Sequence, residues 1–286
     1  MAGILTGQTA IVTGASRGFG RSIALGLAAA GATVTLTARS KEKLDETASQ
    51  IEALGGRALA VPGDVSCRRD VADVVAATEA RFGAVTILVN NAGVSGPYGP
   101  VWTLDPDEWW AAQNVIVRGT LLYMTAVMPG MISRHEGRVI NVTSCGGQWF
   151  TPHLSCYGVS KSGQIRLAEH AAAEAKPHGV NVFILDPGTV ITDMAEATIK
   201  SLDAQRWVPK MVDYLTKLKH TGDPAAGLAR CAQMCIQLAS GRYDALAGRF
   251  LLPKDDFDEL LLEPAPRPGT AIIPRERPRA AVASAR

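Results

Sequence analysis

The chain has 286 residues, of which 47% are hydrophobic and 20% charged, enough to bury a large core within one α/β domain. Its formal net charge of +2 creates no strong field toward nucleic acid or an acidic membrane, so neither is expected as a partner. The five cysteines form an odd, scattered set that suits a reduced cytoplasmic chain better than a disulfide framework.

The first residues run straight into a strand-like segment, without the basic start, apolar core and cleavage site of a signal peptide. The uncharged run at residues 22–38 is interrupted by glycines and is marginal in length for a membrane span. Both observations predict a cytoplasmic location. The five histidines show no spacing to acids or cysteines that a zinc site would need, so no metal is predicted.

Short apolar, β-branched runs alternate with amphipathic helical stretches along the chain. The predicted strands are residues 10–13, 33–37, 58–62, 87–90, 138–142, 181–185 and 248–252. Continuous apolar strands separated by helices indicate a parallel sheet that is covered on both faces. The sequence therefore predicts a doubly wound α/β Rossmann fold with a mostly parallel seven-stranded sheet and helices on both faces.

One catalytic domain is expected over residues 1–262, with a lid segment at about 193–220 that is rich in Met, Lys and helix formers. From Pro264 to Arg286 the chain has five prolines, five arginines and one acidic residue. Such a composition buries too little apolar surface to offset the entropy of ordering, so residues 263–286 are predicted to be a mobile tail. A partner-binding role for this tail is the alternative.

A glycine-rich turn follows the first predicted strand and opens the next helix. It reads Thr13-Gly14-Ala15-Ser16-Arg17-Gly18-Phe19-Gly20. Glycines let a pyrophosphate approach the backbone amides at a helix N-terminus, where the dipole favours negative charge. The strand–turn–helix context predicts a dinucleotide site, and a glycine-rich turn without a ligand is the alternative.

The spacing of these glycines resembles that of the short-chain dehydrogenase/reductase family. The other matching motifs, in the family's order, are Asp64-Val65, Asn90-Asn91-Ala92-Gly93, Tyr157-x-x-x-Lys161 and Pro187-Gly188. Each motif alone is modest, but together they are highly specific. The resemblance covers roughly residues 5–195 and implies an oxidoreductase that interconverts a ketone and a secondary alcohol with a nicotinamide cofactor.

The end of the second predicted strand indicates which dinucleotide binds. An NAD enzyme usually places a carboxylate there to hold the ribose hydroxyls. Here Ala38 occupies that position, and Arg39 and Arg17 could pair with a 2′-phosphate. NADP(H) is therefore the predicted cofactor, with solvated surface charges as the alternative for each arginine.

The resemblance also implies a set of cofactor contacts. Within it, Asp64 would hold the adenine amino group, unless it is an ordinary turn acid, and Thr192 would hold the nicotinamide amide. The full set is Gly14, Ser16, Arg17, Gly18, Phe19, Gly20, Arg39, Ser40, Asp64, Val65, Asn91, Ala92, Gly93, Tyr157, Lys161, Pro187, Gly188, Val190 and Thr192.

Three residues are predicted to carry the chemistry. Tyr157 and Lys161 are four apart on a predicted helix, residues 157–175, so both project from one face, and Ser144 follows the fifth predicted strand. A free phenol has a pKa near ~10, so a neighbouring ammonium is needed to make its anion accessible. Lys161 is expected to lower this pKa and to bind the ribose, Tyr157 to exchange a proton with the substrate oxygen, and Ser144 to stabilise the oxyanion.

Two residues depart from the family pattern. Ile116 stands where the family commonly has an asparagine that is thought to support a water beside the lysine, and Asn114 is two residues out of register. Asp186 precedes Pro-Gly, where Asn, Ala or Ser is usual. Because of Ile116, an NADP(H)-binding regulatory protein with little turnover is the second hypothesis.

Aromatic residues in the predicted loops favour a bulky, apolar or cyclic ketone as substrate. The candidate pocket walls are Ser95, Tyr98, Gly146, Gln148, Trp149, Phe150, Leu154, Thr189, Met194 and Trp207. By analogy with the family, the helices at residues 105–131 and 157–175 would pair in a homo-oligomer, a tetramer or a dimer.

Overall fold

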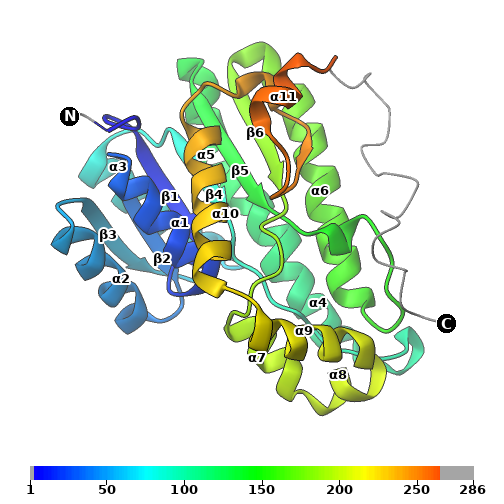
Figure 1. Ribbon diagram of the computed structural model, residues 1–286. Helices are drawn as coiled ribbons and strands as arrows, with labels where there is room; N and C mark the ends of the chain where they lie inside the picture. Colours follow the sequence, from blue (N-terminus) through cyan, green and yellow to red (C-terminus); the bar gives the residue numbers. More distant parts are fainter. Residues whose placement is uncertain (1–2, 265–286) are drawn as a thin grey trace.

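A seven-stranded sheet forms the centre of the computed structural model, which describes residues 3–264 (Figure 1). Its strands are β1 (Thr9–Thr13), β2 (Thr33–Ala38), β3 (Arg57–Pro62), β4 (Ile87–Asn90), β5 (Gly137–Val142), β6 (Val180–Leu185) and β7 (Phe250–Leu251). The spatial order is β3-β2-β1-β4-β5-β6-β7, and every neighbouring pair is parallel. The predicted fold is confirmed, and the predicted strands differ from the observed ones only at their ends.

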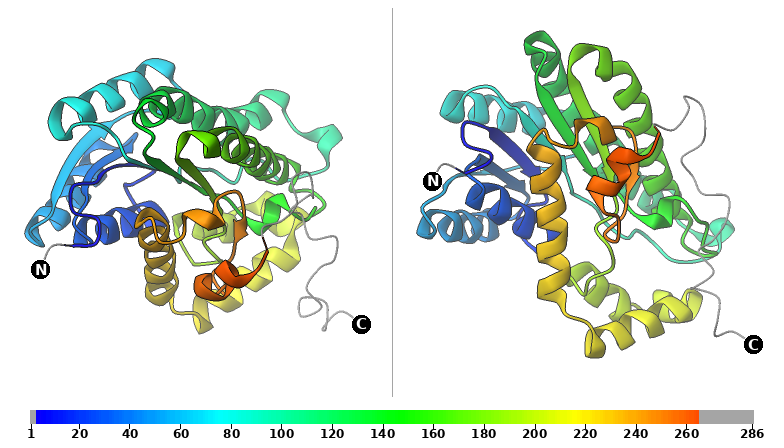
Figure 2. Two further views of the ribbon diagram at one scale, coloured as in Figure 1. Left: turned by 90° about the horizontal axis from the view of Figure 1, so that it is seen from above. Right: turned by 45° about the horizontal axis from the view of Figure 1, so that its top comes forward.

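Helices cover both faces of the sheet, as the view from above in Figure 2 shows. One layer consists of α1 (Gly18–Ala29), α2 (Lys41–Ala53) and α10 (Pro224–Ala239). The other consists of α3 (Arg68–Phe82), α5 (Gly119–Arg134) and α6 (Ser155–Ala175). Alternate residues of a strand pack against the two helical layers. Val12 packs in the core on the side of α1, and Ile11 packs in the core on the side of α3. Both faces are apolar, which explains why the strands read as continuous hydrophobic runs.

Helix α4 (Pro106–Gln113) runs through a π-helical segment, η2 (Asn114–Arg118), into α5. By length and composition this continuous stretch, Pro106–Arg134, could cross a membrane, with a mean hydropathy of 1.5. It instead packs against β4, β5 and α3, with 44% of its most apolar window buried. Its apolar character is therefore accounted for by its place in the helical layer.

The segment predicted as a lid forms three short helices, α7 (Asp193–Lys200), α8 (Leu202–Trp207) and α9 (Pro209–Thr221). They lie beyond the carboxyl ends of the strands, at the bottom of Figure 1. A small separate core joins α8 and α9 to the loop after β4 through Tyr98, and the Tyr98 hydroxyl lies 2.8 Å from Thr198 Oγ1 on α7. The loop after β4 thus holds these three helices in place.

The remaining elements are short. They are α11 (Phe257–Leu262) and the 3-10 turns η1 (Val101–Thr103), η3 (Cys145–Gly147), η4 (Lys176–His178) and η5 (Asp244–Leu246). The predicted tail lies, from residue 265 onward, outside the described residues.

Candidate active site

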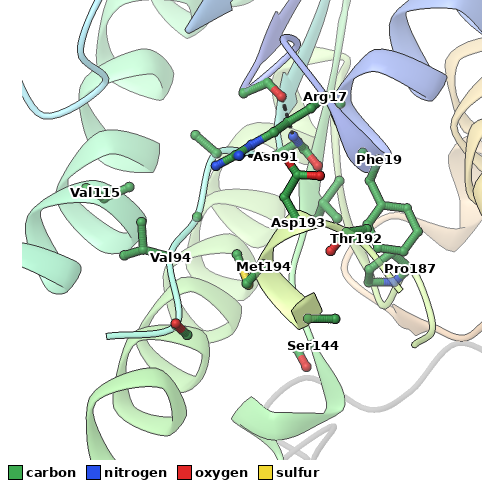
Figure 3. A pocket seen from close by; sticks show the side chains of 18 of the residues that line it. Arg17, Phe19, Asn91, Val94, Val115, Ser144, Pro187, Thr192, Asp193 and Met194 are labelled. Carbon is green, nitrogen blue, oxygen red and sulfur yellow. Dashed lines mark hydrogen bonds and ion pairs between the residues drawn. The ribbon is translucent and has the colours of Figure 1, made fainter. Parts of the chain in front are cut away.

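A cavity of about 540 Å³ lies at the carboxyl ends of the strands, around the point where the strand order reverses between β1 and β4 (Figure 3). In doubly wound sheets this switch point is where ligands bind. Every residue that the sequence assigns to catalysis or to the cofactor lines this cavity. The fold therefore brings the whole predicted set together, while the role of each residue stays a prediction.

The glycine turn forms a cradle that side chains would fill. A Cβ on Gly20 would lie 2.2 Å from Gly14 O, and one on Gly14 would lie 2.9 Å from Asn91 Nδ2. Helix α1 starts here without a side-chain cap, so the amide groups of its first turn are left for an anion. The cradle fits the pyrophosphate of a dinucleotide.

Thr13 and Asn91 brace this turn against β4. Thr13 Oγ1 accepts hydrogen bonds from the amides of Asn91, at 2.9 Å, and Ala92, at 3.1 Å. The side-chain amide of Asn91 donates to Thr13 O at 2.9 Å. Asn91 thus uses its side chain to hold the turn, and Thr13, which sequence reasoning gave no role, is its partner. The sequence feature that could have indicated this role is the Thr-Gly pair that opens the turn.

The end of the cavity beside β2, where the adenosine is predicted to bind, carries several positive charges. Arg39 is exposed and has no ion-pair partner within residues 3–264, and Lys43, which sequence reasoning missed, lines the same end. Arg17 points across the cavity to Asp193, with 2.6 Å between its Nη1 and the carboxylate (Figure 3). Both side chains of this pair are more than half exposed, at 57% and 56%. Arg17 therefore joins the glycine turn to the start of α7.

Two of the residues predicted to contact the cofactor form hydrogen bonds within the loops in which they lie. Ser40 caps α2 by accepting a hydrogen bond from the amide of Lys43 at 3.4 Å. Asp64 Oδ1 accepts from the amide and the hydroxyl of Ser66, at 2.8 Å and 2.6 Å. The alternative for Asp64, an ordinary turn acid, matches this geometry.

Ser144, Tyr157 and Lys161 meet where the loop after β5 lies on α6. Gly147 permits this contact, because a Cβ there would lie 2.6 Å from the backbone carbon of Lys161. The Ser144 hydroxyl accepts from the amide of Gly146 at 3.0 Å and hydrogen-bonds Tyr157. Lys161 Nζ lies 6.0 Å from the centre of the Tyr157 ring.

Burial is the largest cause of the pKa shifts of Tyr157 and Lys161. It raises the pKa of Tyr157 to about 12, which the Ser144 hydrogen bond opposes and the charge of Asp186 reinforces. It lowers the pKa of Lys161 to about 8, which Asp186 opposes. The expected lowering of the Tyr157 pKa by Lys161 stays a prediction, and in the cofactor-free protein the cost of enclosing a phenolate is the largest effect.

Asp186 ties two site loops together, a role that sequence reasoning missed. Its carboxylate accepts from the amide of Cys145 at 2.5 Å and from that of Gly188 at 2.6 Å, and only 6% of the residue is exposed. It therefore links the Ser144 loop to the Pro187-Gly188 loop. The sequence feature that could have indicated this role is that Asp186 departs from the family pattern.

The predicted substrate pocket is partly wrong. Ser95, Tyr98, Leu154, Thr189 and Met194 line the cavity. The other predicted wall residues do not line it, namely Gly146, Gln148, Trp149, Phe150 and Trp207. Phe150 points into solvent, and Trp207 packs on His153, with 5.1 Å between ring centres. The walls that were missed are Val94, Val115, Thr198, Met211 and Leu215. This side of the cavity is mainly aliphatic and thioether in character.

Within residues 3–264, no group of three or more His, Cys, Asp or Glu side chains is arranged to hold a metal ion. The charged side chains that line the cavity are Arg17, Arg39, Lys43, Asp64, Lys161 and Asp193.

Comparison of the sequence with known proteins identifies its family. The family model for short chain dehydrogenases matches residues 8–203. A short chain dehydrogenase of Pseudocercospora fijiensis (strain CIRAD86) is 34% identical over 282 residues, which is 96% of this chain and 89% of the relative. A 3-oxoacyl-[acyl-carrier-protein] reductase of Synechocystis sp. is 36% identical over 193 residues, which is 67% of this chain and 78% of the relative.

Solved structures give the same result. Levodione reductase superposes with a TM-score of 0.79 at 26% identity, covering 91% of this chain and 100% of its own. A gluconate 5-dehydrogenase from Burkholderia cenocepacia J2315 was solved in complex with NADP and tartrate. It superposes with a TM-score of 0.73 at 30% identity, covering 87% of this chain and 94% of its own. The chain belongs to the short-chain dehydrogenase family of oxidoreductases.

The charge of Asp186 should control both neighbouring titrations. In Asp186→Asn, the pKa of Lys161 should fall below about 8 and that of Tyr157 should drop from about 12 toward its usual value, since the carboxylate raises both. NMR of ¹³C-labelled lysine, assigned with Lys161→Met, measures the first value in the cofactor-free protein. Asp73→Asn, an exposed and distant change, is the control. A folded Asp186→Asn protein with an unchanged Lys161 pKa would contradict this electrostatic account.

Proposed function

We propose that the protein is an NADP(H)-dependent oxidoreductase that interconverts a ketone and a secondary alcohol on a bulky or cyclic apolar substrate. The observation that carries this proposal is the convergence of Ser144, Tyr157 and Lys161 in a cavity that continues to the glycine cradle. Reduced cysteines, all five of them unpaired, fit the proposed cytoplasmic location.

The three side chains have different roles in the proposed reaction. When bound, NADPH supplies the hydride. Tyr157 gives its proton to the substrate oxygen as negative charge develops there, and Ser144 donates a hydrogen bond to the same oxygen. Lys161 is mostly protonated at pH 7, because its pKa is about 8, and it offers its charge to the tyrosine and to the ribose hydroxyls.

The preference for NADP(H) follows from the charges at the end of β2. Ala38 supplies no carboxylate for ribose hydroxyls, and Arg39 and Lys43 line the cavity beside it. Arg17 can reach a 2′-phosphate only by leaving Asp193, an exposed pair whose loss is inexpensive. The NADP-bound gluconate 5-dehydrogenase among the similar structures supports this choice.

The proposed substrate half of the cavity is apolar. Its walls include Val94, Val115, Met194, Met211 and Leu215. Similar proteins are named as reductases of levodione and of 3-oxoacyl-[acyl-carrier-protein], which supports a carbonyl substrate without fixing its identity. A panel of cyclic and linear ketones, followed by consumption of NADPH, tests this proposal.

The second candidate is an NADP(H)-binding regulatory protein with little turnover. It is favoured by Ile116, whose side chain is fully buried and cannot hydrogen-bond a water beside the lysine. The same ketone panel separates the two, since a regulatory protein would bind NADPH tightly and consume none of it.

NADPH should bind at least about tenfold more tightly than NADH, because pairing a phosphate with guanidinium groups contributes a charge-assisted interaction. Titration of both cofactors by fluorescence measures this ratio. Arg39→Ala should weaken NADPH and leave NADH unaffected, and Arg69→Ala, exposed on α3, is the control. Equal affinities of the two cofactors in the wild-type protein would refute the assignment.

Tyr157→Phe should leave NADPH binding nearly intact and reduce turnover by orders of magnitude, because it keeps the ring and removes the transferable proton. Lys161→Ala should damage both binding and turnover. Tyr214→Phe, at a half-exposed tyrosine on α9, is the matched control. The measurements are single-turnover rates and cofactor titrations, and wild-type turnover in Tyr157→Phe would remove the proton-transfer role.

We further propose that the chain forms a homo-oligomer, a tetramer or a dimer, through α5 and α6. These helices expose apolar side chains, with Leu121 43% and Val159 50% accessible. Light scattering at micromolar concentration should give a multiple of the 30.2 kDa chain mass. Val159→Asp should shift the mass toward the monomer, whereas a monomeric wild-type protein would refute the proposal.

A further inference from the structure

A buried amide stands directly behind the lysine of the site. Gln164 follows Lys161 by three residues on α6 and is completely enclosed. Its Oε1 accepts a hydrogen bond from Lys161 Nζ at 2.9 Å. Its Nε2 donates to Thr120 Oγ1 on α5 at 3.0 Å. Because an ammonium can only donate, the amide oxygen must face the lysine, and Thr120 receives the NH₂ group on the other side.

The contacts of Lys161 show what this amide contributes. The ammonium has three donors, and its two acceptors within residues 3–264 are Val142 O, at 2.9 Å, and Gln164 Oε1. The third donor is left for the cavity that Lys161 lines. An enclosed ammonium is costly unless it is hydrogen-bonded, so loss of either acceptor would favour its neutral form.

Within residues 3–264, Gln164 is the side chain whose hydrogen bond to the Lys161 ammonium the structure shows. A Cβ on Gly93 would lie 3.9 Å from Ile116 Cγ1 and 3.9 Å from Lys161 Nζ, so both side chains approach Gly93. The Ile116 side chain is purely hydrocarbon and offers no acceptor. The titratable groups that surround Lys161 are Asp186 and Tyr157, with Tyr98 and the Cys145 thiol around the tyrosine.

We propose that Gln164 is a positioning residue, whose amide, fixed by Thr120, holds the Lys161 ammonium charged and directed into the cavity. It provides from α6 the side-chain amide that the family pattern leads one to expect from position 116. The catalytic part of this inference rests on the proposed function, whereas the protonation part concerns the cofactor-free protein alone.

The test replaces Gln164 by Met, which has a similar size and no amide. The pKa of Lys161 should fall by about one unit in the cofactor-free protein, by NMR of labelled lysine, because a hydrogen bond to a charged group is lost. The maximal rate should fall at least about tenfold, and the pH at which the rate declines should move down equally. Gln164→Glu keeps an acceptor and should retain turnover while raising the pKa of Lys161.

Two further variants separate positioning from mere packing. Gln113→Met removes another buried amide, which bonds Cys156 O at 3.0 Å and does not touch Lys161, so it should lower stability without moving the pKa of Lys161. Ile116→Asn, added to Gln164→Met, should restore part of the lost rate by supplying an amide from position 116.

The outcomes are distinct. An unchanged Lys161 pKa in folded Gln164→Met overturns the inference. If that variant does not fold, Thr120→Val keeps Gln164 but releases its NH₂ group, and an unchanged Lys161 pKa there overturns the inference equally. If the wild-type protein reduces no ketone, the proposed function fails, yet the lysine titration of the variants still decides the role of Gln164.

Discussion

The structure of the site depends on one constraint, which is that a lysine ammonium is enclosed with only 4% of the residue exposed. Such a charge must be hydrogen-bonded to remain charged. The carbonyl of Val142, at the last residue of β5, supplies one acceptor, and Gln164 on the same helix supplies another. The lysine can therefore stay protonated at neutral pH only where α6 lies against the carboxyl end of β5.

The rest of the cavity follows from the same edge of the sheet. All seven strands are parallel, so their carboxyl ends converge and the loops after β1, β4, β5 and β6 meet there. Few contacts fix these loops to one another. Asp186 joins the loop after β5 to the loop after β6, and Asn91 joins the loop after β4 to the glycine turn. Each link joins one side chain to backbone groups of another loop, so the relative position of the loops depends on Asp186 and Asn91.

Sequence alone was sufficient where a local rule applies. Apolar runs with both faces buried predicted the strands, and the glycines predicted the cradle, because close approach of the backbone requires them. Contacts made over long separations were not predictable in this way: Arg17 meets Asp193 at a separation of 176 residues. The aromatic loop residues illustrate the same limit, since Phe150 points away from the cavity and no period dictates the direction of a loop side chain.

Gln164 is an intermediate case, because its position three residues after Lys161 places it on the same helical face, where such a contact is expected. The family pattern gives no indication of Gln164, because it places the usual amide at position 116, where this chain has Ile116. Ile116 lies buried in η2, and the amide that hydrogen-bonds the lysine belongs to α6. What the ammonium requires is an acceptor at one point in space, and a residue outside the motif can supply it, as Gln164 does. A missing side chain in a motif is thus evidence of lost function only after the surroundings of that point have been searched.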